Sequence, residues 1–299
     1  MHVLITGGTG FIGSALVPAL LADGWSVTVL TRNPGQASQA LPAAVRLVDT
    51  LAEVHQPVTA VVNLAGENLG EKRWTARRKQ AFFDSRVGLT QELVAWMRGL
   101  DAPPAVLVSG SAVGYYGAQG HATVDETTPP HDEFQHRLCR DWEAAAQAAE
   151  SLGLRVVRLR IGVVLDAGGG ALQAMMPPFR WGLGGWLGHG RQWMAWIHRH
   201  DLVSLIQQAL ADPTLQGPVN AVAPNPVTNK HFSKALGAAL RRPVLLPVPA
   251  FMLRLLVGEM AHLLLTGQRA VPAAAQAVGF AFAYPTVEVA FADILARER

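Results

Sequence analysis

The sequence predicts an α/β protein built on a doubly wound parallel sheet, with a smaller, mostly helical C-terminal lobe. Short apolar, β-branched runs alternate with helical patterns through the first half of the chain. The runs are nearly continuous rather than alternating, as in strands that helices cover on both faces. A glycine-spaced turn between Gly7 and Gly13 joins the first strand pattern to the first helical pattern. Together these observations indicate a Rossmann-type fold.

The elements of the first half follow from these patterns in chain order. We expect strands at residues 2–6, 26–31, 60–64, 105–109 and 155–160. Helical periodicity predicts helices at residues 11–23, 76–99 and 139–152. We therefore predict a cofactor-binding Rossmann domain over residues 1–165, to which residues 195–225 return.

The second half, residues 166–299, is predicted to form the substrate-binding lobe. Residues 168–190 are rich in glycine and tryptophan and are expected to form a long loop. Helices are expected at 201–211, where Asp201 is a candidate N-cap, and at 227–240. The apolar stretch Phe251 to Leu265 contains three ionisable residues and is expected to form a buried or partner-facing helix rather than a membrane span.

Composition excludes several classes of protein. The 299 residues carry a formal charge of +3, and the basic residues are scattered, so no nucleic-acid partner is expected. Cys139 is the only cysteine, which predicts a chain without internal disulfides and a cytoplasmic location. The first strand begins directly at the N-terminus, so no secretory leader is expected. The pattern predicts no metal site and favours no particular oligomeric state.

The glycine turn predicts a dinucleotide site. Gly7 permits a tight turn, Gly10 lets the backbone approach a pyrophosphate, and Gly13 allows close packing of helix on strand. The phosphates would lie at the N-terminus of the helix, where free N–H groups favour negative charge. The cofactor-binding residues predicted here are Gly7, Gly8, Thr9, Gly10, Phe11, Ile12 and Gly13.

The end of the second strand indicates which dinucleotide binds. Thr31 and Arg32 stand where a carboxylate would favour NAD, and a guanidinium there would bind a 2′-phosphate. We therefore predict NADP(H) as the cofactor, the alternative being that Arg32 is a solvated loop residue.

Two further segments are candidates for the same site. The small residues at the end of the third strand suit backbone that lies under the cofactor, although an ordinary strand exit is the alternative. Arg86 could reach the cofactor phosphates or ribose from its helix, or form a surface ion pair instead. The residues of the strand exit are Asn63, Leu64, Ala65 and Gly66.

These motifs resemble the extended short-chain dehydrogenase/reductase superfamily, which contains NAD(P)-dependent sugar-nucleotide epimerases and dehydratases. The resemblance covers most of the chain. More specifically, the chain resembles the atypical, YfcH-like "epimerase family protein" branch of this superfamily. The segments that carry it are 6–13, 63–68, 108–111, 114–117, 178–185 and 196–202.

The resemblance implies a catalytic Ser or Thr at the end of the serine strand and a Tyr-x-x-x-Lys pair on the next helix. The lysine is absent, because no lysine occurs between Lys79 and Lys230. An alignment through Trp142 and Glu143 puts the tyrosine position near Phe134 or Gln135 and the lysine position near Leu138 or Cys139. Proton transfer by a tyrosine–lysine pair, which the resemblance implies, is therefore not expected in this chain.

Other hydroxyl groups could act instead. Ser109 or Ser111 could polarise a substrate oxygen while Tyr115 or Tyr116 moves the proton, the alternative being that all four are structural. His136 is a further titratable candidate but is expected at the surface.

The remaining candidates are one cysteine, and four polar residues of the second half of the chain. Cys139 is expected to be a small buried thiol. Arg180, His189, Arg191 and Gln192 could hold an anionic or polyhydroxylated ligand.

We therefore predict an NADP(H)-binding oxidoreductase or epimerase-like enzyme that acts on a small polar, possibly sugar-nucleotide-like, substrate. The alternative is a catalytically silent NADP(H)-binding sensor or regulatory protein. Loss of the tyrosine–lysine pair from a chain that keeps the phosphate-binding turn motivates this alternative.

Overall fold

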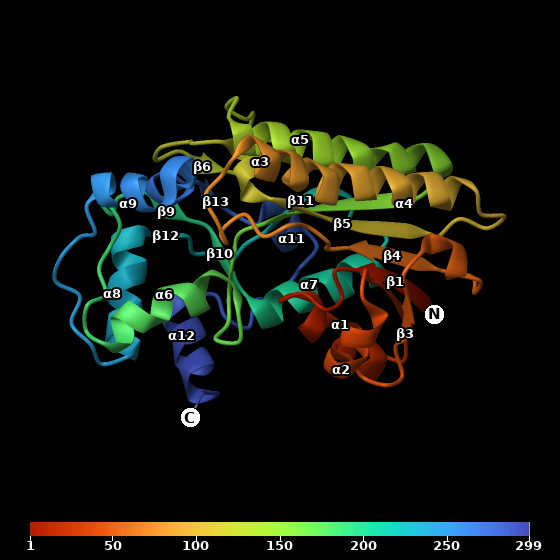
Figure 1. Cartoon of the computed structure of the whole chain (residues 1–299), viewed down its shortest axis with the longest axis horizontal. Coiled ribbons are helices and arrows are strands. Elements are labelled where there is room, and N and C mark those ends of the chain that lie inside the picture. Colours follow the sequence, from red (N-terminus) through yellow and green to blue (C-terminus); the bar gives the residue numbers. More distant parts are fainter. Residues whose placement is uncertain (299) are drawn as a thin grey trace.

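A seven-stranded parallel sheet forms the centre of the molecule in the computed structural model, which describes residues 1–298 (Figure 1). The strand order is β11-β7-β5-β4-β1-β2-β3, and every neighbouring pair is parallel. The doubly wound α/β fold predicted from the sequence is thus confirmed. The strands are β1 (His2–Thr6), β2 (Ser26–Leu30), β3 (Arg46–Val48), β4 (Ala60–Asn63), β5 (Val106–Ala112), β7 (Arg155–Ile161) and β11 (Gly217–Ala221).

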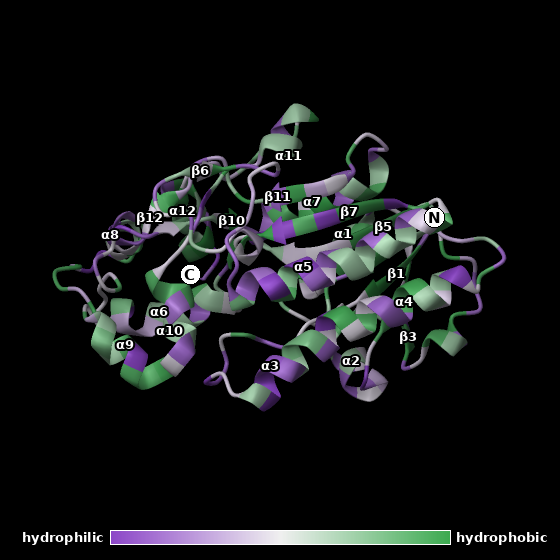
Figure 2. Cartoon of the chain, turned by 90° about the horizontal axis from the view of Figure 1, so that it is seen from above, coloured by the Kyte–Doolittle hydropathy of each residue, from purple (hydrophilic) through white to green (hydrophobic). Residues whose placement is uncertain are grey.

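Helices cover both faces of the sheet, as the apolar strand patterns predict. Helices α3 (Ala76–Phe83), α4 (Leu89–Arg98) and α5 (Phe134–Gln147) lie on one face, and α1 (Gly13–Ala22), α2 (Pro34–Ala40) and α7 (Arg199–Ala211) lie on the other (Figure 1). Hydrophilic and hydrophobic residues alternate along α4 and α5, so each helix can bury one side (Figure 2). Two apolar cores result, one on each face of the sheet.

The predicted helix at 76–99 is interrupted. Between α3 and α4, residues Asp84–Gly88 form a turn of π-helix, which shifts the following residues around the helix axis. Such insertions are frequent at functional sites. This one contains Arg86.

The Gly- and Trp-rich segment is more ordered than expected. Helix α6 (Gly170–Arg180) occupies the first half of the predicted loop. Three small two-stranded sheets also form outside the main sheet: β8 (Val163–Leu165) with β10 (Trp196–His198), β9 (Trp193–Met194) with β12 (Val227–Thr228), and β6 (Thr123–Val124) with β13 (Arg269–Ala270). Helices α8 (Asn229–Ala239), α9 (Ala250–Val257), α10 (Ala261–Leu265), α11 (Ala273–Ala277) and α12 (Val287–Ala296) complete the chain.

The cap of helix α7 differs from the prediction. His198, not Asp201, is the N-cap residue, and its Nδ1 accepts a hydrogen bond from the backbone N–H of His200. The buried carboxylate of Asp201 instead accepts hydrogen bonds from the backbone N–H groups of Ala283 and Tyr284, at 3.0 Å each. Asp201 therefore ties α7 to the C-terminal segment.

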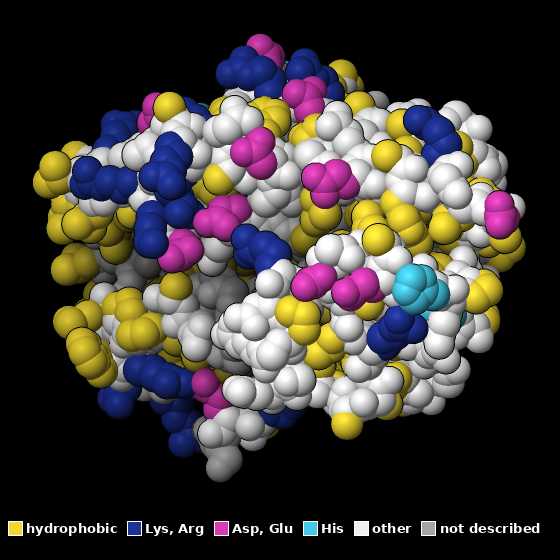
Figure 3. Space-filling view, turned by 45° about the vertical axis from the view of Figure 1, so that its right-hand side comes forward, with side chains coloured by type: hydrophobic (Ala, Val, Ile, Leu, Met, Phe, Trp, Pro, Cys, Tyr) yellow, Lys and Arg dark blue, Asp and Glu magenta, His cyan; other side chains and the backbone are white. Residues whose placement is uncertain are grey.

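The late apolar segment is mostly exposed rather than buried. Phe251, Leu255 and Leu256 on α9 are each more than 60% exposed, whereas Leu253 is buried. Hydrophobic side chains and Lys or Arg side chains lie side by side along the left-hand edge of Figure 3. Of the helices described for residues 1–298, none is long and apolar enough to cross a membrane.

Candidate functional site

A cleft of about 980 Å³ opens at the carboxyl ends of β1, β2 and β4. In open parallel sheets this edge is where ligands bind, because the strand order reverses there. The predicted cofactor residues that line the cleft are Gly7, Thr9, Gly10, Thr31, Arg32, Leu64, Ala65 and Gly66. The cleft thus brings together the three segments that the sequence singled out.

The glycine turn has the geometry that a phosphate site needs. Gly7 has a φ of 71°, and a Cβ added to Gly13 would stand 2.2 Å from the carbonyl oxygen of Gly7. A side chain at Gly10 would be 3.1 Å from the same oxygen, so backbone alone faces the cleft there. The turn and the start of α1 therefore fit the pyrophosphate of a dinucleotide.

The remaining predicted residues of the turn support it from outside the cleft. A Cβ at Gly8 would lie 2.7 Å from the side chain of Val29. The ring of Phe11 contacts Gly169 and Gly170 and lies under the guanidinium of Arg199, 5.1 Å from the ring centroid. Ile12 is the N-cap residue of α1 and packs against the apolar core. These residues position the turn rather than line the cleft.

Arg32 follows β2 and lies in the cleft. Its exposed guanidinium has no hydrogen-bond or ion-pair partner among residues 1–298. Asn33 beside it caps α2, because its side-chain oxygen accepts a hydrogen bond from the backbone N–H of Gln36. The cleft also contains Asn33, Gln36, Asp49, Ser85, Leu89 and Glu92, which the sequence analysis did not single out.

Asn63 at the end of β4 lies behind the cleft in a buried hydrogen-bond network. Its side chain accepts from Thr6 Oγ1 at 2.7 Å and donates to Thr90 Oγ1 at 2.8 Å. Thr90 also accepts a hydrogen bond from the indole of Trp142 at 3.1 Å. Asn63 thus fixes the relative positions of β1, β4 and α4.

Arg86 lies against the wall of the cleft, not at the surface. Its guanidinium would be 2.9 Å from a Cβ at Gly66, and it lies over the ring of Trp142 at 5.3 Å. It donates to the carbonyl oxygen of Glu67 at 2.9 Å. Burial lowers the pKa of this guanidinium, and the neighbouring Cys139 and Glu67 oppose that shift only partly. The structure contains no carboxylate in an ion pair with Arg86 within residues 1–298.

The two predicted serines differ in the hydrogen bonds that their hydroxyl groups donate. Ser111 donates its hydroxyl proton to Glu143 at 2.7 Å, and Arg160 holds the same carboxylate with two bonds of 2.9 and 3.0 Å. Ser109 accepts a bond of 3.4 Å from Asn63, and its own proton has only a weak 3.4 Å contact with the carbonyl oxygen of Gly110. Both serines are buried.

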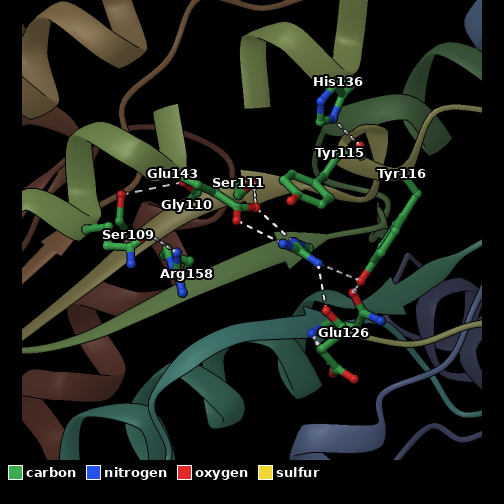
Figure 4. A network of polar contacts seen from close by, with 12 residues as sticks. Ser109, Gly110, Ser111, Tyr115, Tyr116, Glu126, His136, Glu143 and Arg158 are labelled. Carbon is green, nitrogen blue, oxygen red and sulfur yellow. Dashed lines mark hydrogen bonds and ion pairs between the residues drawn. The ribbon is translucent and has the colours of Figure 1, made fainter. Parts of the chain in front are cut away.

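Glu143, labelled beside Ser111 in Figure 4, forms a buried ion pair with Arg160 that the sequence analysis did not find. Burial opposes the charge of Arg160, but the hydrogen bonds and charge of Glu143 outweigh that effect and raise the pKa of the guanidinium. The only signal in the sequence was the set of three arginines that lie among apolar residues in β7, of which Arg160 is the buried one. Its partner lies on another element and could not be identified from periodicity.

The two predicted tyrosines also differ. Tyr116 is fully buried, and its hydroxyl donates to Asn220 at 2.6 Å and accepts from Arg160 at 3.0 Å. Burial raises the pKa of Tyr116 to about 12, although the adjacent Arg160 acts in the opposite direction. Tyr115 is partly exposed, its ring lies on the guanidinium of Arg160 at 3.5 Å, and its hydroxyl has no hydrogen-bond partner within the described chain.

His136 and Cys139 are both on the buried side of α5. His136, expected at the surface, is buried, and its Nδ1 is 2.7 Å from the carbonyl oxygen of Tyr115. This contact fixes the turn that carries both tyrosines (Figure 4). Cys139 is buried as expected, and burial raises the pKa of its thiol to about 12. It is therefore not a nucleophile at neutral pH.

The predicted substrate residues do not form one cluster. Arg180 pairs with Glu298 at 2.6 Å at the surface, and the side chain of Arg191 is exposed. Gln192 is buried and donates to two carbonyl oxygens, and His189 lines a second cavity. Only His189 and Gln192 therefore lie near a common hollow.

Comparison with known proteins agrees with this geometry. Residues 3–222 match the model of the NAD dependent epimerase/dehydratase family. The chain belongs to this family. Residues 248–294 match a second model, a domain of unknown function.

Relatives within the family are similar over nearly the whole chain. A chloroplastic SDR39U1 homologue of Arabidopsis thaliana is 42% identical over 99% of this chain and 87% of its own length. The epimerase family protein YfhF of Bacillus subtilis is 37% identical over 99% of this chain and 98% of its own. These names confirm the resemblance to the "epimerase family protein" branch of the extended short-chain dehydrogenase/reductase superfamily.

A solved structure of the same branch has the same fold. The crystal structure of human epimerase family protein SDR39U1 with NADPH superposes with a TM-score of 0.90 at 37% identity, covering 99% of each chain. This epimerase-family chain and that human protein therefore share one fold over nearly their whole lengths.

Proposed function

We propose that this protein is an NADP(H)-binding oxidoreductase or epimerase-like enzyme that acts on a small polar, possibly sugar-nucleotide-like, substrate. One observation carries the proposal: the guanidinium of Arg32, which has no partner among residues 1–298, lies just after β2 inside a cleft whose glycine turn fits a pyrophosphate. A permanently charged planar donor there favours a 2′-phosphate over a bare hydroxyl. The human relative crystallised with NADPH supports the same choice.

The residues of the cleft divide the work of binding. The backbone of Gly7 to Gly10 and the start of α1 would hold the pyrophosphate, and Arg32 with Asn33 would hold the 2′-phosphate. Leu64 to Gly66 form the wall under the rest of the cofactor, and Arg86 behind Gly66 supplies a fixed positive charge. When bound, the nicotinamide supplies or accepts a hydride.

Tyr115 is the best candidate for moving the proton. It is the only one of the four predicted hydroxyl residues that is not buried, and its hydroxyl has no partner within residues 1–298. Ser111 cannot donate to a substrate oxygen while its one proton is bonded to Glu143. Tyr115 would therefore exchange the proton, and Arg160 under its ring would hold its orientation.

The first experiment is a titration with NADPH and with NADH, followed by energy transfer from the tryptophans. NADPH should bind more tightly, and Arg32→Ala should remove that preference while leaving NADH binding unchanged. Arg98→Ala, an exposed arginine outside the cleft, is the matched control. Equal binding of the two cofactors by the wild type would contradict the proposal.

A sensor without turnover is the second candidate function. Ser111 and Tyr116 already use their hydroxyl groups within the protein, which leaves few groups free for chemistry. A screen for hydride transfer from deuterium-labelled NADPH, in the wild type and in Tyr115→Phe, distinguishes the two. Transfer that Tyr115→Phe abolishes without weakening NADPH binding would exclude the sensor.

The proposal also assigns a binding lobe to the substrate and a cellular location to the protein. The lobe of residues 166–299 would hold the small-molecule substrate beside the Rossmann domain. A cytoplasmic location fits the single, buried cysteine. Fractionation of cells that express the tagged protein tests this location.

A further inference from the structure

The segment that follows the cofactor cleft in the chain also reaches helix α9. It comprises residues 67–75, which lie between β4 and α3 without regular secondary structure, and we call it the strap. Its first residue, Glu67, lines the cleft directly after Gly66. Near its other end, Arg73 is bonded to α9, and Figures 1 and 2 both show the strap on the side of α3 that faces α9 and α10. The strap therefore contacts both the cofactor cleft and α9.

The π-turn of residues 84–88 holds the strap at its cleft end. The backbone N–H of Glu67 donates to Ser85 Oγ at 3.0 Å, and the carbonyl oxygen of Glu67 accepts a hydrogen bond from Arg86 at 2.9 Å. Ser85 lines the cleft as well. A cofactor that fills the cleft would therefore lie against the residues that hold this end of the strap.

Hydrogen bonds within the strap connect its two ends. The indole N–H of Trp74 donates to the carbonyl oxygen of Leu69 at 2.9 Å, and the backbone N–H of Gly70 donates to the side-chain oxygen of Asn68 at 2.9 Å. Arg78 on α3 donates to the carbonyl oxygen of Asn68 at 2.8 Å. A displacement of one end is therefore passed to the other end through packed and bonded groups.

Arg73 forms the contact between the strap and α9. Its Nε donates to the carbonyl oxygen of Leu256 at 2.8 Å, and its Nη2 donates to the carbonyl oxygen of Leu255. Because α9 ends at Val257, these carbonyl groups belong to its last turn and have no partner within the helix. A positive charge is also favourable at the C-terminus of a helix. Arg73 thus holds the end of α9 in place.

A second contact joins the same two regions. Lys79 on α3 forms an ion pair with Glu259, which follows α9. Arg73 and Glu259 are exposed, so water can replace both contacts without unfolding of the core. The apolar face of α9 is also mostly exposed. Helix α9 can therefore open locally, and the strap opposes this opening.

We propose that the strap transmits the occupancy of the cofactor cleft to α9. The cofactor would contact the strap only while the strap is in place beside the cleft, so its binding favours that state, in which Arg73 holds α9. The inference rests on the cofactor binding of the proposed function and goes beyond it, because it makes Arg73 a positioning residue outside the cleft.

This coupling would give the alternative function, a cofactor sensor, a surface at which occupancy is reported. The exposed apolar face of α9 carries Phe251, Leu255 and Leu256 and lies within the matched domain of unknown function. This face would be held in one position when the cofactor is bound and would open more often when the cleft is empty.

Hydrogen–deuterium exchange of the full-length protein, with and without saturating NADPH, tests the proposal. NADPH should slow the exchange of the α9 amides, because opening of α9 requires release of the strap. Helix α8, which has no hydrogen bond to the strap among residues 1–298, measures the general effect of a ligand on stability. The slowing of α9 should exceed that of α8 by roughly fivefold or more.

Arg73→Ala should remove most of this difference. At saturating NADPH its α9 should slow no more than about twice as much as its α8, and its affinity for NADPH should fall about fivefold, because coupling between two sites is reciprocal. Lys72→Ala is the matched control, since Lys72 is an exposed cation that pairs with Glu71 within the strap, and it should behave as the wild type. Arg73→Lys, which keeps the charge but not the forked donor, should retain part of the effect.

The outcomes separate this inference from the proposed function. Equal slowing of α9 and α8 in the wild type, while NADPH binds, would overturn the inference alone. The same conclusion would follow if Arg73→Ala made α9 exchange faster by one factor with and without NADPH, since Arg73 would then only stabilise the helix. Absence of NADPH binding in the fluorescence titration would contradict the proposed function, and the inference with it.

Discussion

The cofactor cleft and the buried network of Ser111, Glu143, Arg160 and Tyr116 both contain an arginine among polar groups. The two regions differ in whether these groups already have hydrogen-bond partners within the protein. In the cleft, Arg32 is exposed and has no partner in the described part of the chain, and the glycine turn presents backbone alone. In the network, Arg160 binds Glu143 with two bonds and Tyr116 with a third, and all three side chains are buried. Groups that the protein already satisfies hold the fold, and groups that it leaves free are available to a ligand.

Whether a polar group already has a partner distinguishes the four candidate catalytic hydroxyl residues, which the sequence alone could not rank. Ser109, Ser111, Tyr115 and Tyr116 lie within eight residues of one another. Only Tyr115 combines exposure with a free hydroxyl. Substitutions in the network should therefore affect stability first, and substitutions in the cleft should affect binding.

The largest effect is expected from Glu143→Ala. Removing the carboxylate leaves the buried Arg160 unpaired, and such a loss costs about 3–5 kcal/mol of unfolding free energy. Urea denaturation followed by circular dichroism measures it. Arg137→Ala is the control, because the exposed pair of Arg137 with Asp132 should contribute less than about 1 kcal/mol. Similar losses in the two variants would remove the distinction between buried and exposed pairs.

A pH dependence extends the comparison to another buried group, His198. Burial, followed by the charge of Arg297, lowers the pKa of His198 from 6.5 to about 4. The unfolded chain therefore binds this proton first as the pH falls, so the folded state loses stability below pH 6.5. From pH 7 to pH 5 the loss should be about 2 kcal/mol.

His198→Asn isolates this titration. Asparagine can still accept the backbone N–H of His200, but it cannot take up the proton. The contribution of His198 to the slope of stability against pH should therefore disappear in denaturation curves collected between pH 5 and pH 7. An unchanged slope would show that other groups cause the acid sensitivity.

A smaller effect distinguishes the two tyrosines. Tyr116→Phe leaves Asn220 and one donor of Arg160 without a partner, so it should lower the unfolding free energy by about 1–3 kcal/mol. Tyr115→Phe should change stability by less than about 0.5 kcal/mol. Thermal denaturation of both variants tests this order. The reverse order would place Tyr115 in the structural network.

The smallest effect on stability is expected in the cleft. Arg32→Ala should change the unfolding free energy by less than about 0.5 kcal/mol, because its guanidinium contacts no partner within residues 1–298. The affinity for NADPH should nevertheless fall about 10- to 100-fold, as expected for the loss of one or two charge-assisted hydrogen bonds. A stability loss without an affinity loss would move Arg32 out of the cofactor site.

The parts predicted well from the sequence are those with local causes. The turn from Gly7 to Gly13 needs glycines for steric reasons that lie within a few residues, and β1 was predicted over its observed range. Arg32 lies in the cleft because parallel strands end at the same edge of the sheet. Such features can be predicted without any knowledge of tertiary contacts.

The parts that could not be predicted depend on distant partners. Ser111 and Glu143 are 32 residues apart, and Tyr116 and Asn220 are 104 apart. The two-residue strands exist only because a remote segment pairs with them. The π-turn at Asp84–Gly88 carries no glycine–proline break or other local signal that marks its start, so one continuous helix was predicted over residues 76–99.

The order of strands in the sheet also bears on how the chain is made. Edge strand β11 pairs with β7, yet the two are separated by residues 162–216. At a synthesis rate of about 5–20 residues per second, roughly 3–11 s therefore pass between the synthesis of β7 and that of its pairing partner β11. An unpaired strand is prone to aggregation, and charged side chains oppose it. Arg155, Arg158 and Arg160 lie in β7 and would protect the nascent chain until β11 leaves the ribosome.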